Sequence, residues 1–345
     1  MARLASNVLP PPTIENLSPP AALPEGEVEA HGKGLGPRGT HIPIVMVDGK
    51  TAHLSMSRYN RIAFKVPQNA ETGMVEVRTQ SGASNPVPLR VARELSDGLH
   101  PVTSPVVSRS GMTFATISGP RGKMTPVSIV RISPDGLGTP FVSGIMNPTG
   151  LAFDPDGDLF VTSRAEGAVY RIDAGGEAET YAEGMGIATG AAFDADGNLF
   201  VGDRNGTIFK IGPDRKIFVY ATLEPSVVAY HLAVGADGTL FVTAPSLSPN
   251  DCIWAIDRDG ATHAWFRGLG RPMGLALDSD SNIYVAASLN AQRGLIRITP
   301  EGRAEHVLAG NNLVGVAFSP LGTAVIATNS AVYDIDLGVE GLRLF

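Results

Sequence analysis

The sequence contains one cysteine in 345 residues and has no long apolar run. Cys252 alone cannot form a disulfide within the chain, so the fold does not depend on oxidation. No apolar stretch approaches the ~18 residues that a membrane-spanning helix needs, and the opening residues, MARLASNVLPPPT, lack the apolar segment of a signal peptide. We therefore expect no membrane partner. As written, the sequence indicates a cytoplasmic protein, or a secreted one if the true N-terminus is missing.

Basic residues are also scarce. Residues 1–92 carry 9 Lys and Arg against 7 Asp and Glu, and the remainder carries 18 against 27, for a net charge of −7. No region has the basic surplus that holds a phosphate backbone, so nucleic acid is not expected as a partner. A Gly-rich phosphate loop, a nucleophile elbow and a paired-cysteine motif are missing from the sequence as well.

Glycine and proline are abundant instead, at 40 and 26 residues, which indicates many turns between short strands. One Asp- and Gly-rich turn between two apolar runs recurs along the chain. Its copies read TGLAFDPDGDLFVTS from 149, TGAAFDADGNLFVGD from 189, YHLAVGADGTLFVTA from 230, MGLALDSDSNIYVAA from 273 and VGVAFSPLGTAVIAT from 314. A degenerate first copy, TSPVVSRSGMTFATI, begins at 103, and the six starts lie 46, 40, 41, 43 and 41 residues apart.

Most copies continue into a third and a fourth apolar strand, such as AVYRID and AETYAEG. Four antiparallel strands in about 41 residues are the signature of a β-propeller blade. We therefore predict an all-β fold with a six-bladed propeller over 103–345. Asp and Gly in the turn are explained by turn geometry. A calcium loop is not indicated, because Leu159 stands where an EF-hand needs Gly and Ala165 where it needs Glu.

Two family resemblances follow from these copies. The stretch ATGAAFDADGNLFVGDRNGTIFKI resembles the NHL repeat, and the same blades resemble the senescence-marker-protein, gluconolactonase and luciferin-regenerating-enzyme family. The resemblance implies a propeller over about two-thirds of the chain. It is a weaker guide to function, because propellers host many unrelated activities.

Residues 12–92 show no such period. They read as short alternating strands between Pro, Gly and Asn turns, including PIVMVDGKTAHLSMS and GMVEVRTQSGASNPVPLRVA, and predict a small antiparallel sandwich. The order of these segments resembles an IPT/TIG domain, an immunoglobulin-like module that in bacterial multidomain proteins serves as a spacer or contact surface. We expect residues 1–11 to be a tail and residues 93–102 to be a linker.

The opening residue of each inner strand is expected to lie near the central channel. In this chain that ring is Thr103, Thr149, Thr189, Tyr230, Met273 and Val314. Metal-dependent lactonases of the resembling family place a Glu, two Asn and an Asp at this position. Since the ring here has no carboxylate, we expect no cofactor, and a divalent metal such as calcium only if the site is rebuilt from other residues. Asn147 is a single neutral donor nearby.

Two further groups of candidate residues follow from the repeat. His231 replaces the Gly that follows the ring position in four of the six copies, and Asp203 is the nearest acid that could orient it as a general base. Both are weak catalytic candidates; a histidine satisfied by stacking or backbone is the simpler interpretation. Loops on the same face carry a set of basic residues that could attract an anion: Arg121, Lys123, Arg164, Arg204, Arg271 and Arg293. Ordinary solvated loop charges are the simpler interpretation of this set.

The leading hypothesis is therefore a non-catalytic binding or scaffold protein whose propeller face recognises a small polar or anionic ligand or a protein. The expected ligand-binding residues are Thr103, Thr149, Thr189, Tyr230, His231, Met273, Arg164, Arg204 and Arg293, with the loop 244–251 as a lid or contact element. Two alternatives stay open: a gluconolactonase-like sugar-lactone hydrolase, and a nucleic-acid-binding NHL propeller. Side chains that simply plug a narrow channel with water are the simpler interpretation of the ring.

Overall fold

A computed structural model of the chain describes residues 10–37, 39–247 and 251–345. Residues 1–9 of the expected tail and residues 248–250 of the expected lid loop lie outside this range. Within it the structure is all-β, and it contains no helix long and apolar enough to cross a membrane. The chain divides into two compact units: residues 1–93 with 306–311, and residues 94–305 with 312–345.

The first unit is built from antiparallel strands in the order β1-β3-β6-β5-β4-β7-β9, with β2 pairing parallel to β9 and β8 pairing with β7. Its strands are β1 Thr13–Ser18, β2 Ala21–Ala22, β3 Glu27–Lys33, β4 Ile44–Val47, β5 Lys50–Arg58, β6 Arg61–Lys65, β7 Gly73–Thr79, β8 Gly82–Ala83 and β9 Val87–Val91. Strand β5 pairs with β4 at its first residues and with β6 along the rest of its length. The β5–β6 pairing shifts register between Leu54 and Met56. Side chains from both groups of strands share one hydrophobic core.

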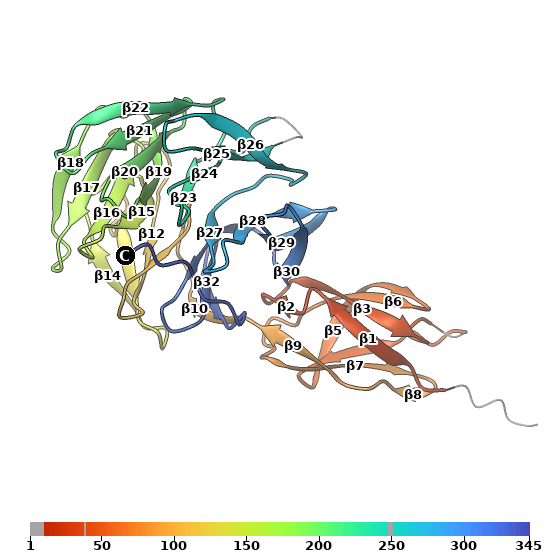
Figure 1. Cartoon of the computed structure of the whole chain (residues 1–345). Coiled ribbons are helices and arrows are strands. Elements are labelled where there is room, and N and C mark those ends of the chain that lie inside the picture. Colours follow the sequence, from red (N-terminus) through yellow and green to blue (C-terminus); the bar gives the residue numbers. More distant parts are fainter. Residues whose placement is uncertain (1–9, 38, 248–250) are drawn as a thin grey trace, which may run out of the picture. The chain divides into compact units, whose positions relative to one another are not determined.

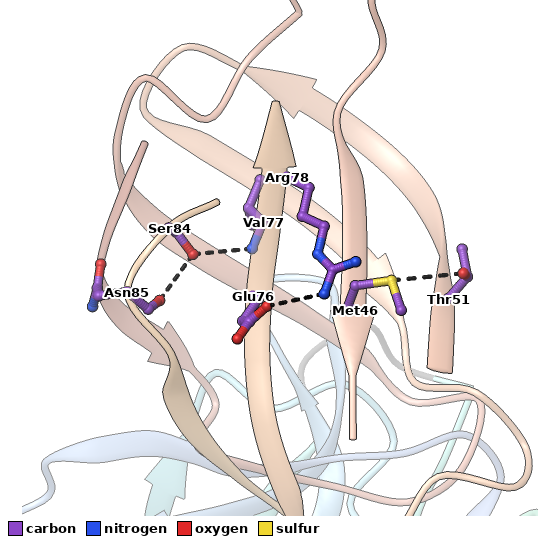
Figure 2. Close-up of polar contacts among 7 residues, drawn as sticks. All are labelled: Met46, Thr51, Glu76, Val77, Arg78, Ser84 and Asn85. Atoms are coloured by element: carbon purple, nitrogen blue, oxygen red, sulfur yellow. Dashed lines mark hydrogen bonds and ion pairs between the residues drawn. The ribbon is translucent and has the colours of Figure 1, made fainter. Parts of the chain in front are cut away.

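Polar side chains fix the end of β7 in this unit. The buried Ser84 hydroxyl accepts the Val77 N–H at 3.0 Å and donates to the Asn85 carbonyl at 2.8 Å (Figure 2). The Asn85 side chain in turn accepts the Ile14 N–H at 2.9 Å and donates to the Ile14 carbonyl at 3.0 Å. Because a buried polar group is costly when unpaired, these bonds favour one register between β1 and the β7 hairpin.

The second unit is a β-propeller, visible in Figure 1 as a series of sheets arranged around a centre. Five separate four-stranded sheets are its blades: β11-β12-β13-β14, β15-β16-β17-β18, β19-β20-β21-β22, β23-β24-β25-β26 and β10-β33-β32-β31. Strands β27, β28, β29 and β30 are also consecutive neighbours in a larger sheet, and residues 306–309 of β30 belong to the first unit. The inner strand of each group begins within three residues of the start of one sequence repeat.

The strands of the first three of these sheets have the following bounds. They are β11 Val106–Val107, β12 Thr113–Thr116, β13 Ile129–Ile132, β14 Gly138–Val142, β15 Pro148–Phe153, β16 Leu159–Ser163, β17 Ala168–Ile172, β18 Ala178–Ala182, β19 Ala188–Phe193, β20 Leu199–Asp203, β21 Thr207–Ile211 and β22 Ile217–Thr222. The remaining strands are β10 Arg93–Ser96, β23 His231–Val234, β24 Leu240–Thr243, β25 Cys252–Ile256, β26 Thr262–Arg267, β27 Leu275–Leu277, β28 Ile283–Leu289, β29 Gln292–Ile298, β30 Ala304–Ala309, β31 Leu313–Phe318, β32 Ala324–Thr328 and β33 Val332–Ile335.

Residues 93–102 were expected to be a linker, but the first four of them form a strand. Residues Arg93–Ser96 form β10, which pairs with β33 as the outermost strand of the last sheet. That sheet therefore combines a strand from the beginning of the propeller with three strands from its end. Pairing satisfies backbone groups that a free linker would leave to water.

The Asp-rich turns close by hydrogen bonds to their own backbone. Asp154 accepts the Asp158 N–H at 2.8 Å, and Asp194 accepts the Asn198 N–H at the same distance. Asp278 accepts the Asn282 N–H in the third such turn, also at 2.8 Å. These carboxylates are thus used as local turn acceptors.

Candidate functional site

The ring residues lie where the inner strands begin, but their hydroxyls are engaged by the backbone. Thr103 donates to the Thr149 carbonyl of the next sheet at 2.6 Å, and Thr149 donates to the Asn147 carbonyl at 3.1 Å. Thr189 donates to the Gly202 carbonyl at 2.9 Å. All three threonines are buried, and each hydroxyl already donates to a backbone carbonyl.

The other three ring residues are also used in packing. Tyr230 is fully buried; its N–H donates to the Thr189 hydroxyl at 3.0 Å and its own hydroxyl donates to the Glu224 carbonyl. Burial raises the pKa of Tyr230, with Asp203 and Glu224 adding to the effect. Met273 is partly buried against an apolar core that includes Val314.

This donor set does not fit a divalent metal. The ring offers no carboxylate, and its threonine and tyrosine hydroxyls already donate to carbonyls. In the described ranges no group of three His, Cys, Asp or Glu side chains could hold a metal ion. Hard cations need several oxygen ligands, most of them anionic, so a lactonase-type metal centre is not supported at this position.

Asn147, the neutral donor near the ring, organises a loop instead. Its side-chain oxygen accepts the Gly122 N–H at 2.8 Å, and its amide donates to the carbonyls of Gly119, Pro120 and Lys123 at 2.8, 3.0 and 3.4 Å. The side chain is buried, and its backbone has a positive φ of 47°. Asn147 therefore fixes the shape of the loop that carries Arg121.

His231 lies at the start of β23 and lines a cavity of about 250 Å³ between the inner strands, which we name the hub cavity. Other lining residues are Thr103, Ser104, Gly150, Gly190, Phe318, Leu342 and Leu344. The imidazole is 3% exposed, and neither of its ring nitrogens has a hydrogen-bond partner in the described protein. Burial lowers the pKa of His231 from 6.5 to about 3, so the ring is neutral at physiological pH.

Asp203 does not orient this histidine. Its carboxylate accepts the Ile187 N–H at 2.9 Å and the Asn205 N–H at 3.1 Å. The carboxylate is buried and serves these two loop amides, while the nitrogens of His231 stay unpartnered. A base with a pKa near 3 and no orienting acid is poorly suited to proton abstraction at neutral pH.

The basic loop residues come together in part. Arg121, Arg164 and Arg204 follow the second strands of three consecutive sheets, and we name them the arginine cluster. Burial lowers the pKa of Arg164, and the positive charges of Arg204 and Arg121 lower it further. Arg164 donates to the Gly119 carbonyl at 3.1 Å, which brings it next to the loop of Arg121.

No ion pair with a carboxylate neutralises the arginine cluster in the described residues. Arg204 donates to the Ser226 carbonyl at 3.1 Å, and the Nε of Arg164 is buried without a partner. Across residues 10–37, 39–247 and 251–345, none of the three guanidinium groups forms an ion pair with Asp or Glu. Arg293 lies apart from them, exposed in β29, and Arg271 is exposed before β27.

Two C-terminal residues contribute to the hub cavity although no sequence motif marks them. Leu342 and Leu344 line the hub cavity, and the Leu342 N–H donates to the Leu277 carbonyl of β27 at 2.9 Å. These residues follow the last strand and belong to no repeat, so the repeat pattern could not place them. The alternating pattern GLRLF at 341–345 was the one available signal, because it indicates an extended segment with two apolar side chains on one side.

No family profile matches the sequence, and no curated protein is similar enough to match. Solved structures share the fold. A gluconolactonase from Xanthomonas campestris superposes with a TM-score of 0.61 at 17% identity, covering 71% of this chain and 89% of its own. An auxiliary nutrient binding protein from Bacteroides ovatus gives 0.55 at 13% identity, covering 95% and 98%. A catalytically inactive variant of virginiamycin B lyase from Staphylococcus aureus gives 0.52 at 15% identity, covering 83% and 94%. At these identities the similarity establishes an all-β, propeller-containing fold, and function has to be argued from the site.

Proposed function

We propose that this chain is a non-catalytic binding protein whose propeller holds a small anionic ligand at the arginine cluster. The observation that carries the proposal is the convergence of Arg121, Arg164 and Arg204 without an acidic partner in the described residues. Guanidinium groups held near one another repel, and the half-buried Arg164 is also partly removed from water. A carboxylate or phosphate would relieve both costs and accept charge-assisted hydrogen bonds.

The geometry around the cluster suits recognition. Asn147 fixes the loop of Arg121 through four hydrogen bonds, and backbone carbonyls hold Arg164 and Arg204. Side chains restrained before binding lose less conformational freedom when the ligand arrives. The Nε of Arg164 is buried without a partner, so contact with a ligand falls to the terminal nitrogens of the guanidinium group.

We also propose a domain arrangement that goes with this role. In it, residues 103–345 are a six-bladed propeller of the NHL or gluconolactonase type, and β27–β30 are the sixth blade; contacts of β27 with β23 and with β31 support this count. Residues 12–92 are an immunoglobulin-like module of the IPT/TIG type. The auxiliary nutrient binding protein from Bacteroides ovatus covers 95% of the chain, which supports a binding role for both units together.

A sugar-lactone hydrolase is the second candidate, because a gluconolactonase shares the fold. A metal-dependent hydrolase is disfavoured because the ring contains no carboxylate and its hydroxyls already donate to backbone carbonyls. Release of acid from D-glucono-δ-lactone, measured with and without added calcium or zinc, separates the two proposals. Turnover above the spontaneous rate would favour the hydrolase.

Isothermal titration at low salt tests the binding proposal directly. The probes are gluconate, galacturonate, citrate and inorganic phosphate, with D-glucose as the uncharged control. We expect saturable binding of at least one anion and none of glucose. Arg164→Gln should weaken it by about 2 kcal/mol, or about thirtyfold, because a hydrogen bond to a charged group is lost. Arg303→Gln is the matched control, since that side chain is 83% exposed on an outer turn. Failure of all four anions to bind at about 10 mM, or equal binding by Arg164→Gln, would refute the proposal.

A further inference from the structure

Strand β22 ends the sheet β19-β20-β21-β22, so one side of its backbone has no neighbouring strand in the described residues. Figure 1 shows it at the outer rim of the propeller. Its first three side chains are apolar and solvent-exposed: Ile217 is 39% exposed, Phe218 56% and Val219 65%. An open strand edge with three consecutive apolar residues presents both backbone polar groups and an apolar patch to a partner.

The other outer strands of the four-stranded groups carry features that discourage such pairing. Strand β14 has Pro140, β18 has Glu179 and β26 has Arg267. Strand β10 begins with Arg93 and Glu94, and β30 is already paired with β2. Charges, proline and covering strands are the usual means by which proteins protect a sheet edge. Strand β22, with the sequence IFVYAT, has none of them.

The alternation of hydrogen bonds assigns the outward-facing groups of β22. The turn between β21 and β22 closes with a bond from the Gly212 N–H to the Lys216 carbonyl. Bonded and non-bonded pairs alternate along antiparallel strands, so Phe218 is the next residue bonded to β21. Ile217 and Val219 therefore direct their N–H and C=O groups away from β21, toward the open side of the sheet.

Strand β14 supports this assignment independently. Pro140 pairs with Val130 as the third residue of β14, and Val219 pairs with Phe209 as the third residue of β22; each lies just before a register shift. Proline has no N–H and is tolerated in a sheet where that N–H would face solvent. The N–H of Val219 therefore needs no partner within its own sheet.

These positions make β22 complementary to a second copy of itself. In an antiparallel pair with a two-fold axis at Phe218, Ile217 faces Val219 of the second copy, so the outward N–H and C=O groups of both residues become bonded. The two Phe218 side chains lie across the axis in a non-bonded pair, where side chains approach most closely. The exposed apolar side chains are thus buried together at the centre of the contact.

The regular part of this edge is short. Pairing of β21 with β22 shifts register between Ile208 and Phe209, which leaves Tyr220 as the extra residue of a bulge. A bulge bends the strand, so regular pairing stops after Val219. A contact of this length is typical of a weak, concentration-dependent dimer.

The charges around the edge suit the same arrangement. Lys216 lies beside the Tyr220 bulge of the second copy. The Tyr220 hydroxyl donates to the Asp257 carbonyl at 2.5 Å. Burial raises the pKa of this tyrosine, and the negative charges of Asp259, Asp194 and Asp257 raise it further. A basic side chain of one copy therefore meets an acidic region of the other, which favours the antiparallel orientation.

We propose that two copies of the chain associate through β22, in antiparallel pairing centred on Phe218, and form a weak symmetric dimer. No residue of the arginine cluster takes part in this contact, so this proposal and the anion-binding proposal can each fail alone.

Sedimentation velocity of the full-length chain between about 2 and about 200 μM tests the proposal. We expect the sedimentation coefficient to rise with concentration toward that of a dimer. Val219→Pro introduces the proline of β14, and Phe218→Glu introduces the glutamate that stands at the same place in β18. Each variant should weaken dimerisation at least tenfold. Thr180→Pro, which alters the position of β18 equivalent to Val219, is the matched control and should dimerise as the native chain does.

Hydrogen exchange tests the register of the contact. The amides of Ile217 and Val219 should exchange severalfold more slowly at about 200 μM than at about 2 μM, while the amide of Thr180 should exchange equally at both concentrations. Unchanged exchange at Ile217 and Val219 in a chain that dimerises would place the interface elsewhere and overturn the proposal.

Three sedimentation results would also overturn it. A native chain that stays monomeric to about 200 μM would leave the edge to a different partner. Assembly beyond a dimer would contradict the two-fold arrangement. Dimerisation of Val219→Pro or Phe218→Glu as strong as that of the native chain, with a folded circular dichroism spectrum, would show that β22 is not the contact.

Discussion

Acid should destabilise the propeller through His231, and the size of the effect can be worked out. Unfolded, this histidine has its ordinary pKa of 6.5; folded, burial lowers the pKa to about 3. Between these values the unfolded chain binds a proton that the folded chain does not. The free energy of unfolding therefore contains the full contribution of neutral His231 above the unfolded pKa of 6.5, and this contribution is lost as the pH falls toward the folded pKa. At about pH 4.5, roughly two pH units below the unfolded value, the loss is about 3 kcal/mol.

Urea unfolding of the native chain and His231→Gly at about pH 7.5 and about pH 4.5 isolates this effect. The other six histidines and all carboxylates are common to both proteins, so they cancel in the difference. Trp254 and Trp265 are the two tryptophans of the chain, and both lie in the sheet that contains His231, on β25 and β26. Their fluorescence therefore reports on the propeller unit.

The cavity left by His231→Gly shifts the stability of the variant equally at both pH values. The difference between the two proteins should accordingly change by about 3 kcal/mol in favour of the variant at the lower pH. A difference that stays constant within about 0.5 kcal/mol would show that His231 titrates normally in the folded protein. The reasoning from burial would then be refuted.

Three further predictions concern the packing, the loop and the metal. Gly190→Ala should lower the free energy of unfolding by about 3 kcal/mol in urea, because a Cβ there would lie 2.5 Å from the Tyr230 carbonyl oxygen; an unchanged midpoint would contradict this close approach. Asn147→Ala should speed hydrogen exchange at Gly122 more than tenfold, since the side chain that accepts its N–H is lost, and equal exchange rates would refute its role in the loop. Calcium at about 5 mM should leave the melting temperature unchanged, whereas a rise of several degrees would reveal a site that the donor set does not provide.

The sequence repeat predicts the strands of the propeller because its features, apolar alternation and Asp-Gly turns, act between residues close in sequence. Alternating apolar residues and Asp-Gly turns fix strands and hairpins without reference to the rest of the chain. The loops after β12, β16 and β20 are equivalent in the repeat, and the charges of Arg121 and Arg204 act on Arg164. Strand β10 could not be foreseen in this way, because its partner β33 lies more than two hundred residues away.

The direction of the ring side chains escaped sequence reasoning for a different reason. Pairing shifts register between Pro148 and Leu151 in β15, and between Ala188 and Ala191 in β19. Thr149 and Thr189 lie inside these irregular stretches. Simple alternation cannot say which way a side chain points at a bulge, so hydroxyls expected at a channel mouth donate to backbone carbonyls instead.

The composite last sheet has a consequence for synthesis on the ribosome. Strand β10 is made before any blade, yet its pairing partner, Val332–Ile335, is made only after the other four-stranded sheets. Until then the edge of β10 stays open, and the propeller cannot close into a ring. The interval between synthesis of β10 and synthesis of β33 should therefore be the time when the nascent chain is most prone to association through an unpaired strand edge.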